Sequence, residues 1–182
     1  MKSLESLIGE LDYILQSPSR KGSLELITVR PKENERLELK EGHITKSDGV
    51  EGDNWKFRKS RHTPDGSPDP ETQINIMNAR VIDSITSRQD EWKKAGDQLF
   101  VNFDITEKNL PAGSQFKIGN EVVLEVSAQP HTGCGKFKDR FGPDALKFVN
   151  HKDYKELRLR GINAFVIQEG TVRPGDEINK IS

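Results

Sequence analysis

The sequence predicts a mainly β fold of the α+β class, in which short strands form a barrel-like core with short helices around it. Two observations support this prediction. Apolar and polar residues alternate over several short runs, and turns rich in glycine, proline and aspartate separate these runs. Helical periodicity is confined to a few segments that do not alternate regularly with the strands, which argues against a parallel sheet built from βαβ units.

The N-terminal residues 2–16 have the pattern of an amphipathic helix, which the segment "SPSRKG" ends. We expect this helix to cover the core or to contact a partner in a dimer. The predicted organisation is therefore an N-terminal helix and linker over residues 1–22, followed by one domain over residues 23–182. The apolar residues that recur at intervals of three and four are Leu4, Leu7, Ile8, Leu11, Ile14 and Leu15.

The first predicted strand is "SLELITVRP", in which Leu24, Leu26 and Thr28 are expected on one face and Pro31 ends the strand. A short alternating run and glycine-rich turns follow in "RLELKEGHITKSDGVEGDNW". The segment "KFRKSRHTPDGSPDP" is the most loop-like part of the chain. A loop of this length in a compact domain is often functional or mobile.

The central part predicts a strand that leads directly into a helix. In "TQINIMNARVIDSI", Ile74 and Ile76 alternate with polar residues, and Asn78 is placed to cap a helix that starts at Ala79. Two further strands are predicted in "DQLFVNFDIT" and "NEVVLEVSAQP". The segment between them, "EKNLPAGSQFKIGN", is interpreted as a turn-rich connection.

The C-terminal part predicts a helical region followed by two strands. The helical region, "GPDALKFVNHKDYKELRLRG", is opened by Pro143 and ended by Gly161. The strands are "INAFVIQEG" and "DEINKIS", joined by the turn "TVRPGD".

Composition excludes several classes of function. The chain has 28 Lys and Arg against 29 Asp and Glu, without a tract of like charges, so we expect neither nucleic-acid nor membrane binding. No apolar stretch is long enough to span a bilayer, and acidic residues interrupt the N-terminus where a signal peptide would be apolar. These features predict a cytoplasmic protein. A single cysteine excludes an internal disulfide and the paired cysteines of a zinc site.

That cysteine, Cys134, lies in "HTGCGKFKDRFG", on a predicted loop after the strand that Pro130 ends. Gly133 and Gly135 are expected to allow backbone conformations closed to other residues and the close approach of a ligand. A nearby positive charge favours the thiolate, which is both a nucleophile and a soft metal ligand, and also suits a phosphate. The residues that supply this charge are Lys136, Lys138 and Arg140, and His131 would add to it if protonated.

Other interpretations of this cysteine are open. A lone intracellular cysteine is most often a small buried hydrophobe. The absence of apolar neighbours, the flanking glycines and the positive charge argue against that interpretation. His131 and Cys134 also suggest the base and nucleophile of a cysteine hydrolase, although such pairs are usually distant in sequence. The remaining histidines, His43, His62 and His151, form no spacing motif.

Several stretches, in order, resemble the MOSC domain, a family named after the C-terminal part of molybdenum cofactor sulfurases. They are "GVEGDNW", "DPETQINIMNARVIDSI", the segment from "DQLFVNF" to "HTGC", and "RLRGINAFVIQEGTVRPGDEI". The resemblance runs from about Ser23 to the C-terminus. It implies a mostly antiparallel β-barrel like the barrel domain of pyruvate kinase, with short flanking helices.

The resemblance also implies a chemistry for Cys134. The matching cysteine of the family is thought to bind molybdenum or to carry a persulfide sulfur, and some members use the bound molybdenum cofactor to reduce N-hydroxylated compounds. In the large sulfurases a separate pyridoxal-phosphate domain supplies the sulfur. No such domain fits within this chain, so any dependence on pyridoxal phosphate would come from a partner.

Individual positions carry over with some departures. Thr132 and Gly133 occupy the two positions before the family cysteine, Asn102 matches a family asparagine, and Asn78 lies where a small polar residue precedes the family's helix. The resemblance implies that these four residues bind the cofactor. Phe100 stands where relatives with cofactor-dependent activity tend to have Arg or Gly. The loop "KFRKSRHTPDGSPDPE" also replaces the His-Gly-Gly type of turn. Cofactor-binding charge would then come from Lys56, Arg58, Lys136 and Arg140.

Three functions follow from these observations. The first is a protein that binds the molybdenum cofactor, with Cys134 as catalytic residue and metal ligand and with a separate electron-donor protein, because no flavin, haem or iron–sulfur motif is visible. The second is a persulfide sulfur carrier that a cysteine desulfurase loads. The third is a binding module that has lost activity. The sequence leaves the choice between monomer and homodimer open.

Overall fold

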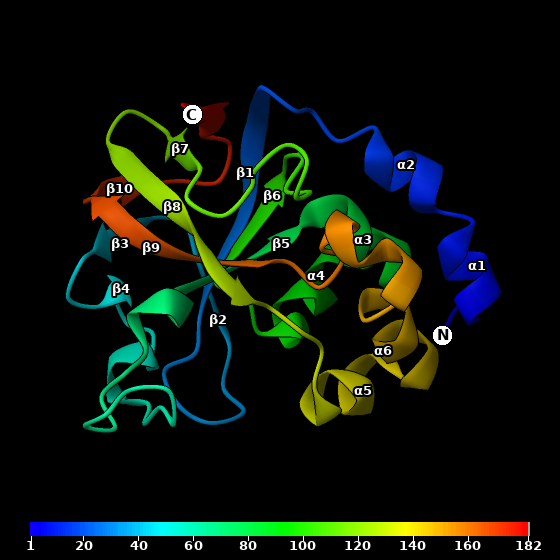
Figure 1. Cartoon of the computed structure of the whole chain (residues 1–182), viewed down its shortest axis with the longest axis horizontal. Helices are drawn as coiled ribbons and strands as arrows, with labels where there is room; N and C mark the ends of the chain where they lie inside the picture. The colour runs from blue at the N-terminus through cyan, green and yellow to red at the C-terminus, as the bar shows by residue number, and fades with distance from the viewer. Residues whose placement is uncertain (182) are drawn as a thin grey trace.

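The computed structural model describes residues 1–181 and contains a closed β-barrel, which lies beside a group of helices (Figure 1). The strands are β1 (Lys21–Val29), β2 (Leu37–Leu39), β3 (Gly42–Thr45), β4 (Gly49–Val50), β5 (Ile74–Asn78), β6 (Leu99–Asn102), β7 (Gln115–Ile118), β8 (Val122–Pro130), β9 (Ile162–Gln168), β10 (Gly170–Val172) and β11 (Glu177–Lys180).

The helices are short. They comprise α1 (Leu4–Ile8), α2 (Leu11–Leu15), α3 (Ala79–Ile85), α4 (Gln89–Trp92), α5 (Gly135–Phe141) and α6 (Pro143–Val149), with 3₁₀ turns η1 (Trp55–Phe57), η2 (Pro70–Thr72), η3 (Lys93–Ala95) and η4 (Lys152–Leu157). Figure 1 shows α1 to α6 gathered on one side of the barrel. Among the described residues, no helix is both long enough and apolar enough to cross a bilayer.

Seven strands close the barrel in the order β11, β7, β8, β9, β5, β6 and β1, and β1 pairs back with β11. All of these pairs are antiparallel except β5 with β6, which run parallel. β2 extends the sheet beside β1, and β10, β3 and β4 form a small separate sheet. The predicted mainly β barrel with short helices is therefore confirmed.

Two apolar clusters lie on the two sides of the barrel wall. One fills the barrel interior with strand residues such as Leu24, Ile74 and Leu124. The other lies outside the wall, where the helices pack over residues such as Met77 and Phe100. Because β5 contributes to both clusters, all five of its residues are buried. Burial on both sides fixes this strand firmly within the fold.

The predicted helix over residues 2–16 is two helices, α1 and α2. The C-cap of α1 is Gly9, and α2 then begins after Glu10, which makes no side-chain capping bond. Glycine is a poor helix former, so the chain bends here at little cost. The bend lets Leu7 and Ile14 both bury in the outer cluster, although they lie on separate helices.

The prediction that Leu24, Leu26 and Thr28 share one face of β1 is wrong, because the strand contains a bulge. The register with β6 shifts between Leu24 and Leu26, so Leu24 and Ile27 enter the barrel while Leu26 joins the outer cluster. A bulge adds one residue to a strand and reverses the alternation after it. The alternating pattern alone does not reveal this reversal.

Three elements lie where turns or loops are predicted. β7 lies in the turn-rich connection, β10 lies between the last two predicted strands, and α5 follows the cysteine. β7 has only two buried apolar residues, Phe116 and Ile118, and is defined by its pairing with β8 and β11. α5 is held by Phe137 and Phe141, which are buried in the outer apolar cluster and have ring centroids 4.9 Å apart. The predicted Asn78 cap is confirmed, since its side chain accepts the N–H of Arg80.

β9 begins after Gly161, where the chain passes very close to β5. Gly161 has a φ of +114°, and a Cβ there would lie 2.1 Å from the carbonyl oxygen of Ile76. Gly175 is a useful comparison, because its φ is +96° but a Cβ there would meet nothing within 4 Å. Gly161 therefore combines a left-handed conformation with a close approach that excludes any side chain.

We expect Gly161→Ala to lower the free energy of unfolding by roughly 3 kcal/mol or more, because it adds a steric clash to backbone strain. Gly175→Ala should cost only about 1 kcal/mol, because it carries the strain alone. Urea unfolding followed by circular dichroism measures both. Equal losses in the two variants would contradict the assigned role of Gly161.

Candidate functional site

Cys134 opens onto a cavity of about 370 Å³ beside the barrel. The cavity lies where β1 ends and where the segments before β6 and after β8 come together. Seven basic side chains line it against one acidic side chain, that of Glu33. The basic residues are Arg30, Lys32, Arg36, Arg58, Lys136, Arg140 and Arg160. We call this space the thiol cavity.

The Cys134 side chain is exposed, in the part of the chain that leaves β8 and enters α5. Its backbone carbonyl accepts the N–H groups of Phe137 and Lys138 and so begins the helix. Phe137 is buried in the outer apolar cluster, which fixes this helix against the barrel. The thiol is thus held at a defined place and is not a small buried hydrophobe.

A bulge in β8 redirects the chain toward this place. Val126 pairs with Ala164 and Pro130 pairs with Ile162, so four steps along β8 match only two along β9. The Nδ2 group of Asn163 donates to the carbonyl oxygen of Pro130 at 3.3 Å, and also to that of Gln129. An amide side chain therefore satisfies the backbone groups that the bulge leaves unpaired.

Gly133 is required for packing and not for an unusual backbone conformation. Its N–H donates to Oδ1 of Asn150 at 2.8 Å, and its carbonyl accepts from Nδ2 of the same residue at 3.0 Å. A Cβ on Gly133 would lie 2.8 Å from Leu146. Neither Gly133 nor Gly135 has a positive φ, so the expectation that they adopt conformations closed to other residues is wrong.

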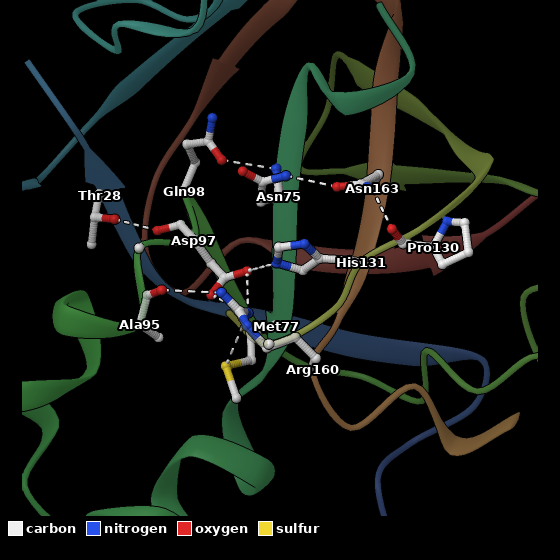
Figure 2. A network of polar contacts seen from close by, with 12 residues as sticks. Thr28, Asn75, Met77, Ala95, Asp97, Gln98, Pro130, His131, Arg160 and Asn163 are labelled. Carbon is white, nitrogen blue, oxygen red and sulfur yellow. Dashed lines mark hydrogen bonds and ion pairs between the residues drawn. The ribbon is translucent and has the colours of Figure 1, made fainter. Parts of the chain in front are cut away.

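A buried ion pair anchors the same segment from the other side (Figure 2). Asp97 is fully buried, and its carboxylate accepts from Nη1 of Arg160 at 2.7 and 2.9 Å and contacts Nε2 of His131 at 2.9 Å. Arg160 also donates through Nη2 to the carbonyl of Ala95 and stacks over the ring of Phe137. These contacts connect the segment before β9, the segment before β6 and the segment after β8.

The charges of this group are set by burial and by each other. Burial would raise the pKa of Asp97, but Arg160 and the hydrogen bond of His131 outweigh it and hold the pKa at about 2. Burial, followed by repulsion from Arg160, lowers the pKa of His131. His131 is therefore neutral near pH 7 and donates to Asp97. It adds no positive charge that would favour the thiolate of Cys134.

A second buried pair supports the floor of the thiol cavity. Nε and Nη2 of Arg30 each donate to Asp53 at 2.8 Å, in the two-pronged geometry typical of arginine with a carboxylate. Nη1 of Arg30 donates to Asn75, which in turn donates to Asn163 at 2.7 Å. This amide chain links the Arg30–Asp53 pair to the bulge that redirects β8.

The remaining basic groups repel one another. Asp53, Asp97 and Glu33 pair with three of the seven cations. Within residues 1–181, the cations of this cavity that have no carboxylate at ion-pair distance are Lys32, Arg36, Arg58 and Arg140.

Burial and the charges of Arg140 and Arg30 lower the pKa of Arg36, and burial with the charges of Arg30 and Arg36 lowers that of Arg58. Nε of Arg36 and Nε of Arg160 are buried and have no hydrogen-bond partner among the described residues. A bound anion would relieve this repulsion and would supply acceptors.

The structure brings most of the sequence-predicted site residues together. Thr132, Cys134, Lys136, Arg140 and Arg58 all line the thiol cavity. Gly133 lines a neighbouring cavity that shares a wall with the first. Lys56 pairs instead with Asp48 at 2.8 Å.

Asn78 and Asn102 have contacts of another kind. Nδ2 of Asn78 donates to Oγ of Ser17 at 2.8 Å, and Oδ1 of Asn102 accepts from Nε of Arg80 at 3.0 Å. Arg80 also donates to the carbonyl of Tyr13. In the described chain, neither asparagine lines the thiol cavity or its neighbour. Both asparagines connect the barrel to the N-terminal segment.

Sequence reasoning missed the residues that build the site, namely Arg30, Arg36, Asp53, Asn75, Asp97, Arg160 and Asn163. A weak signal was present. Arg30 follows the apolar run "LITV" and Asp97 precedes "LFV", and a charge beside a buried strand needs a partner. The sequence does not indicate which partner each charge would have.

The side chains of the thiol cavity suit a metal that is already coordinated by a cofactor. Among residues 1–181, no three His, Cys, Asp or Glu side chains are grouped to hold a bare ion. Cys134 offers one soft sulfur ligand, and the cations beside it suit an anionic group such as a phosphate. A molybdenum cofactor, which combines a phosphate-bearing pterin with a metal already bound to sulfur, fits these residues.

A family model described as the MOSC domain matches residues 58–179, which is more than half of the chain. The chain belongs to the MOSC family. No curated protein matches the sequence. This MOSC domain has the fold of several solved structures, although the identities are too low to indicate more than the fold.

Three of these structures illustrate the likeness. YuaD from Bacillus subtilis has a TM-score of 0.63 and 19% identity, covering 87% of this chain and 94% of its own. YiiM from Geobacillus stearothermophilus has a TM-score of 0.57 and 16% identity, covering 88% and 75%. YiiM from Escherichia coli has a TM-score of 0.54 and 17% identity, covering 88% and 70%.

Asp97→Asn should lower the free energy of unfolding by roughly 3–5 kcal/mol at pH 7, because it leaves Arg160 buried without a counter-charge. The matched control is Asp90→Asn. Asp90 pairs with Arg88 at 2.7 Å on the surface, and losing this pair should cost less than about 1 kcal/mol.

The pH dependence gives a second test of Asp97. Its pKa is lowered from 3.8 to about 2, so its stabilisation is present above pH 3.8 and is lost as the pH falls through about 2. The stability difference between wild type and Asp97→Asn should therefore narrow below pH 4. Urea unfolding at a series of pH values measures this difference. A difference that stays constant down to pH 2 would contradict the assignment.

Proposed function

We propose that this MOSC domain binds the molybdenum cofactor in the thiol cavity, with the Cys134 thiolate as a ligand of the molybdenum. One observation carries the proposal: an exposed thiol opens onto a cavity with four cations that have no carboxylate partner among residues 1–181. A thiolate is a ligand suited to a soft metal, and the cations suit an anionic phosphate. A cavity of this size also lies within the range of small-molecule sites.

Three guanidinium groups are assigned to the anionic part of the cofactor. In the part of the chain that the structure describes, Arg36, Arg58 and Arg140 face the cavity without an ion-pair partner, and Nε of Arg36 lacks a hydrogen-bond partner. Guanidinium groups bind phosphate through paired N–H donors, and binding would reduce their mutual repulsion. Arg30 is excluded from this role because Asp53 already occupies two of its nitrogen atoms.

The rest of the chain positions the sulfur. Asp97, which Arg160 holds in place, fixes His131, Asn150 fixes Gly133, and α5 fixes the residues after Cys134. The thiol is therefore preorganised, which reduces the cost of ordering a loop when a ligand binds. The bound cofactor would supply the electron-transfer chemistry, with electrons delivered by a separate donor protein.

A persulfide sulfur carrier is the second candidate, and the exposure of Cys134 favours it. In that function a cysteine desulfurase would transfer a sulfur atom to the Cys134 thiolate, and an acceptor would later remove it. This function needs an accessible thiol but gives no role to the unpaired arginines. We therefore rank it below cofactor binding. A binding module that has lost activity ranks third, because it also gives no role to these arginines.

Metal analysis tests the proposal directly. Protein expressed in a host that makes the cofactor should contain molybdenum and a pterin, as measured by mass spectrometry of the metal and by pterin fluorescence. Cys134→Ser should reduce the molybdenum content by about tenfold or more, since it removes the soft ligand. Arg36→Gln/Arg58→Gln should reduce the pterin content as well.

The matched control is Lys59→Gln/Arg61→Gln, which removes the same charge from exposed residues outside the cavity. It should retain the wild-type content. Wild-type protein without molybdenum would reject the proposal. A mass increase of one sulfur atom at Cys134, after incubation with a cysteine desulfurase and cysteine, would then support the sulfur carrier. Absence of both the molybdenum and the added sulfur atom would support a binding module that has lost activity.

A further inference from the structure

A second cavity, of about 530 Å³, lies on the other side of the segment that carries the thiol. It shares His131, Thr132 and Arg160 with the thiol cavity, whereas Cys134 lines only the first. The two spaces are therefore neighbours separated by a single segment of chain. We call the second space the rear cavity.

The rear cavity is formed by the β8 bulge. Where four steps along β8 match two along β9, the strands separate, and residues 127–130 form one wall of the hollow. Asn163 and Asn150 hold this wall and the following Gly133 in place through their side-chain amides. The hollow is thus a fixed feature of the barrel edge and not a gap between mobile loops.

Apolar atoms form the larger share of its surface, although polar residues also line it. The apolar side chains that line it are Ala112, Ala128, Pro130, Val149, Leu159 and Ile162. A cavity of several hundred Å³ with an apolar lining and a few polar groups at its edge is the usual form of a small-molecule site. The body of a ligand here would therefore be apolar.

The charges at its edge favour an anion. The charge of Glu107 acts on Arg158, where it opposes the lowering of the pKa by burial. Lys152 and Lys155 also line the cavity, and within the described chain neither has an ion-pair or hydrogen-bond partner for its ammonium group. Two unpaired ammonium groups beside an apolar hollow are complementary to one acidic head group on an apolar body.

We infer that the rear cavity binds a small organic anion with an apolar body, such as an aromatic carboxylate, at a site distinct from the thiol cavity. The ligand would lie against residues 131–133 from the side opposite to the thiol. The inference does not depend on molybdenum or on the proposed function. The two proposals can therefore fail independently.

Titration of the ¹⁵N-labelled full chain with 2-naphthoate tests this inference, with neutral 2-naphthylmethanol as the matched ligand. We expect 2-naphthoate to shift the amide signals of Gly133, Gly161 and Ala128 and to bind more weakly as salt is added. The neutral ligand should bind more weakly than the anion. Equal affinity for both ligands, or no binding, would overturn the inference.

Two variants locate the ligand. Lys152→Gln/Lys155→Gln should weaken 2-naphthoate roughly fivefold, since it removes two exposed charges. Ala128→Trp places a large ring in the rear cavity from an exposed position and should abolish binding. Lys59→Gln/Arg61→Gln is again the charge-matched control and should bind as wild type does. The unfolding midpoint of each variant checks that the fold is retained.

Alkylation of Cys134 by iodoacetamide distinguishes the two cavities. A ligand in the rear cavity leaves the thiol open, so saturating 2-naphthoate should not change the rate. If 2-naphthoate enters the thiol cavity instead, alkylation slows and inorganic phosphate competes with it. That result, or unchanged binding in Ala128→Trp, would overturn the inference.

Discussion

The buried carboxylate of Asp97 is the contact on which the rest of the site depends. It connects Arg160 and His131, which lie 63 and 34 residues away along the chain. A fully buried charge is tolerated only when its partners are fixed, so the three segments that carry these residues must meet in one arrangement. This arrangement places the segment before Cys134. The Asp97–Arg160 ion pair therefore determines the position of the thiol without contacting it.

The site is rigid because amide side chains form hydrogen bonds with backbone groups that would otherwise be unpaired. The β8 bulge would leave carbonyl groups unpaired, and Asn163 satisfies them. Gly133 would leave an N–H and a carbonyl unpaired, and Asn150 satisfies both. The same bulge that turns the chain toward the thiol cavity opens the rear cavity behind it. One local irregularity in a strand thus produces two spaces with different chemistry.

The electrostatics of the site differ from those of the whole chain. The net charge is −1, and the short basic stretch over residues 56–62 contributes only Arg58 to the thiol cavity. The thiol cavity is nevertheless strongly basic, because Arg36, Arg58 and Arg140 come from three separate segments. The carboxylates near them are already used by Arg30, Arg160 and Lys136. A near-neutral composition therefore does not argue against an anion site.

Elements with a local pattern are predictable from the sequence alone: the strands β5, β8 and β9, the Asn78 cap, the start of α6 at Pro143, and Cys134 as the candidate site residue. The tertiary structure is needed to define β7, β10 and the bulges, because these features depend on pairing with distant strands. It also decided the buried pairs. A charged residue in the sequence signals that a partner exists, but closure of the barrel selects which partner it meets and hence which cations remain free for a ligand.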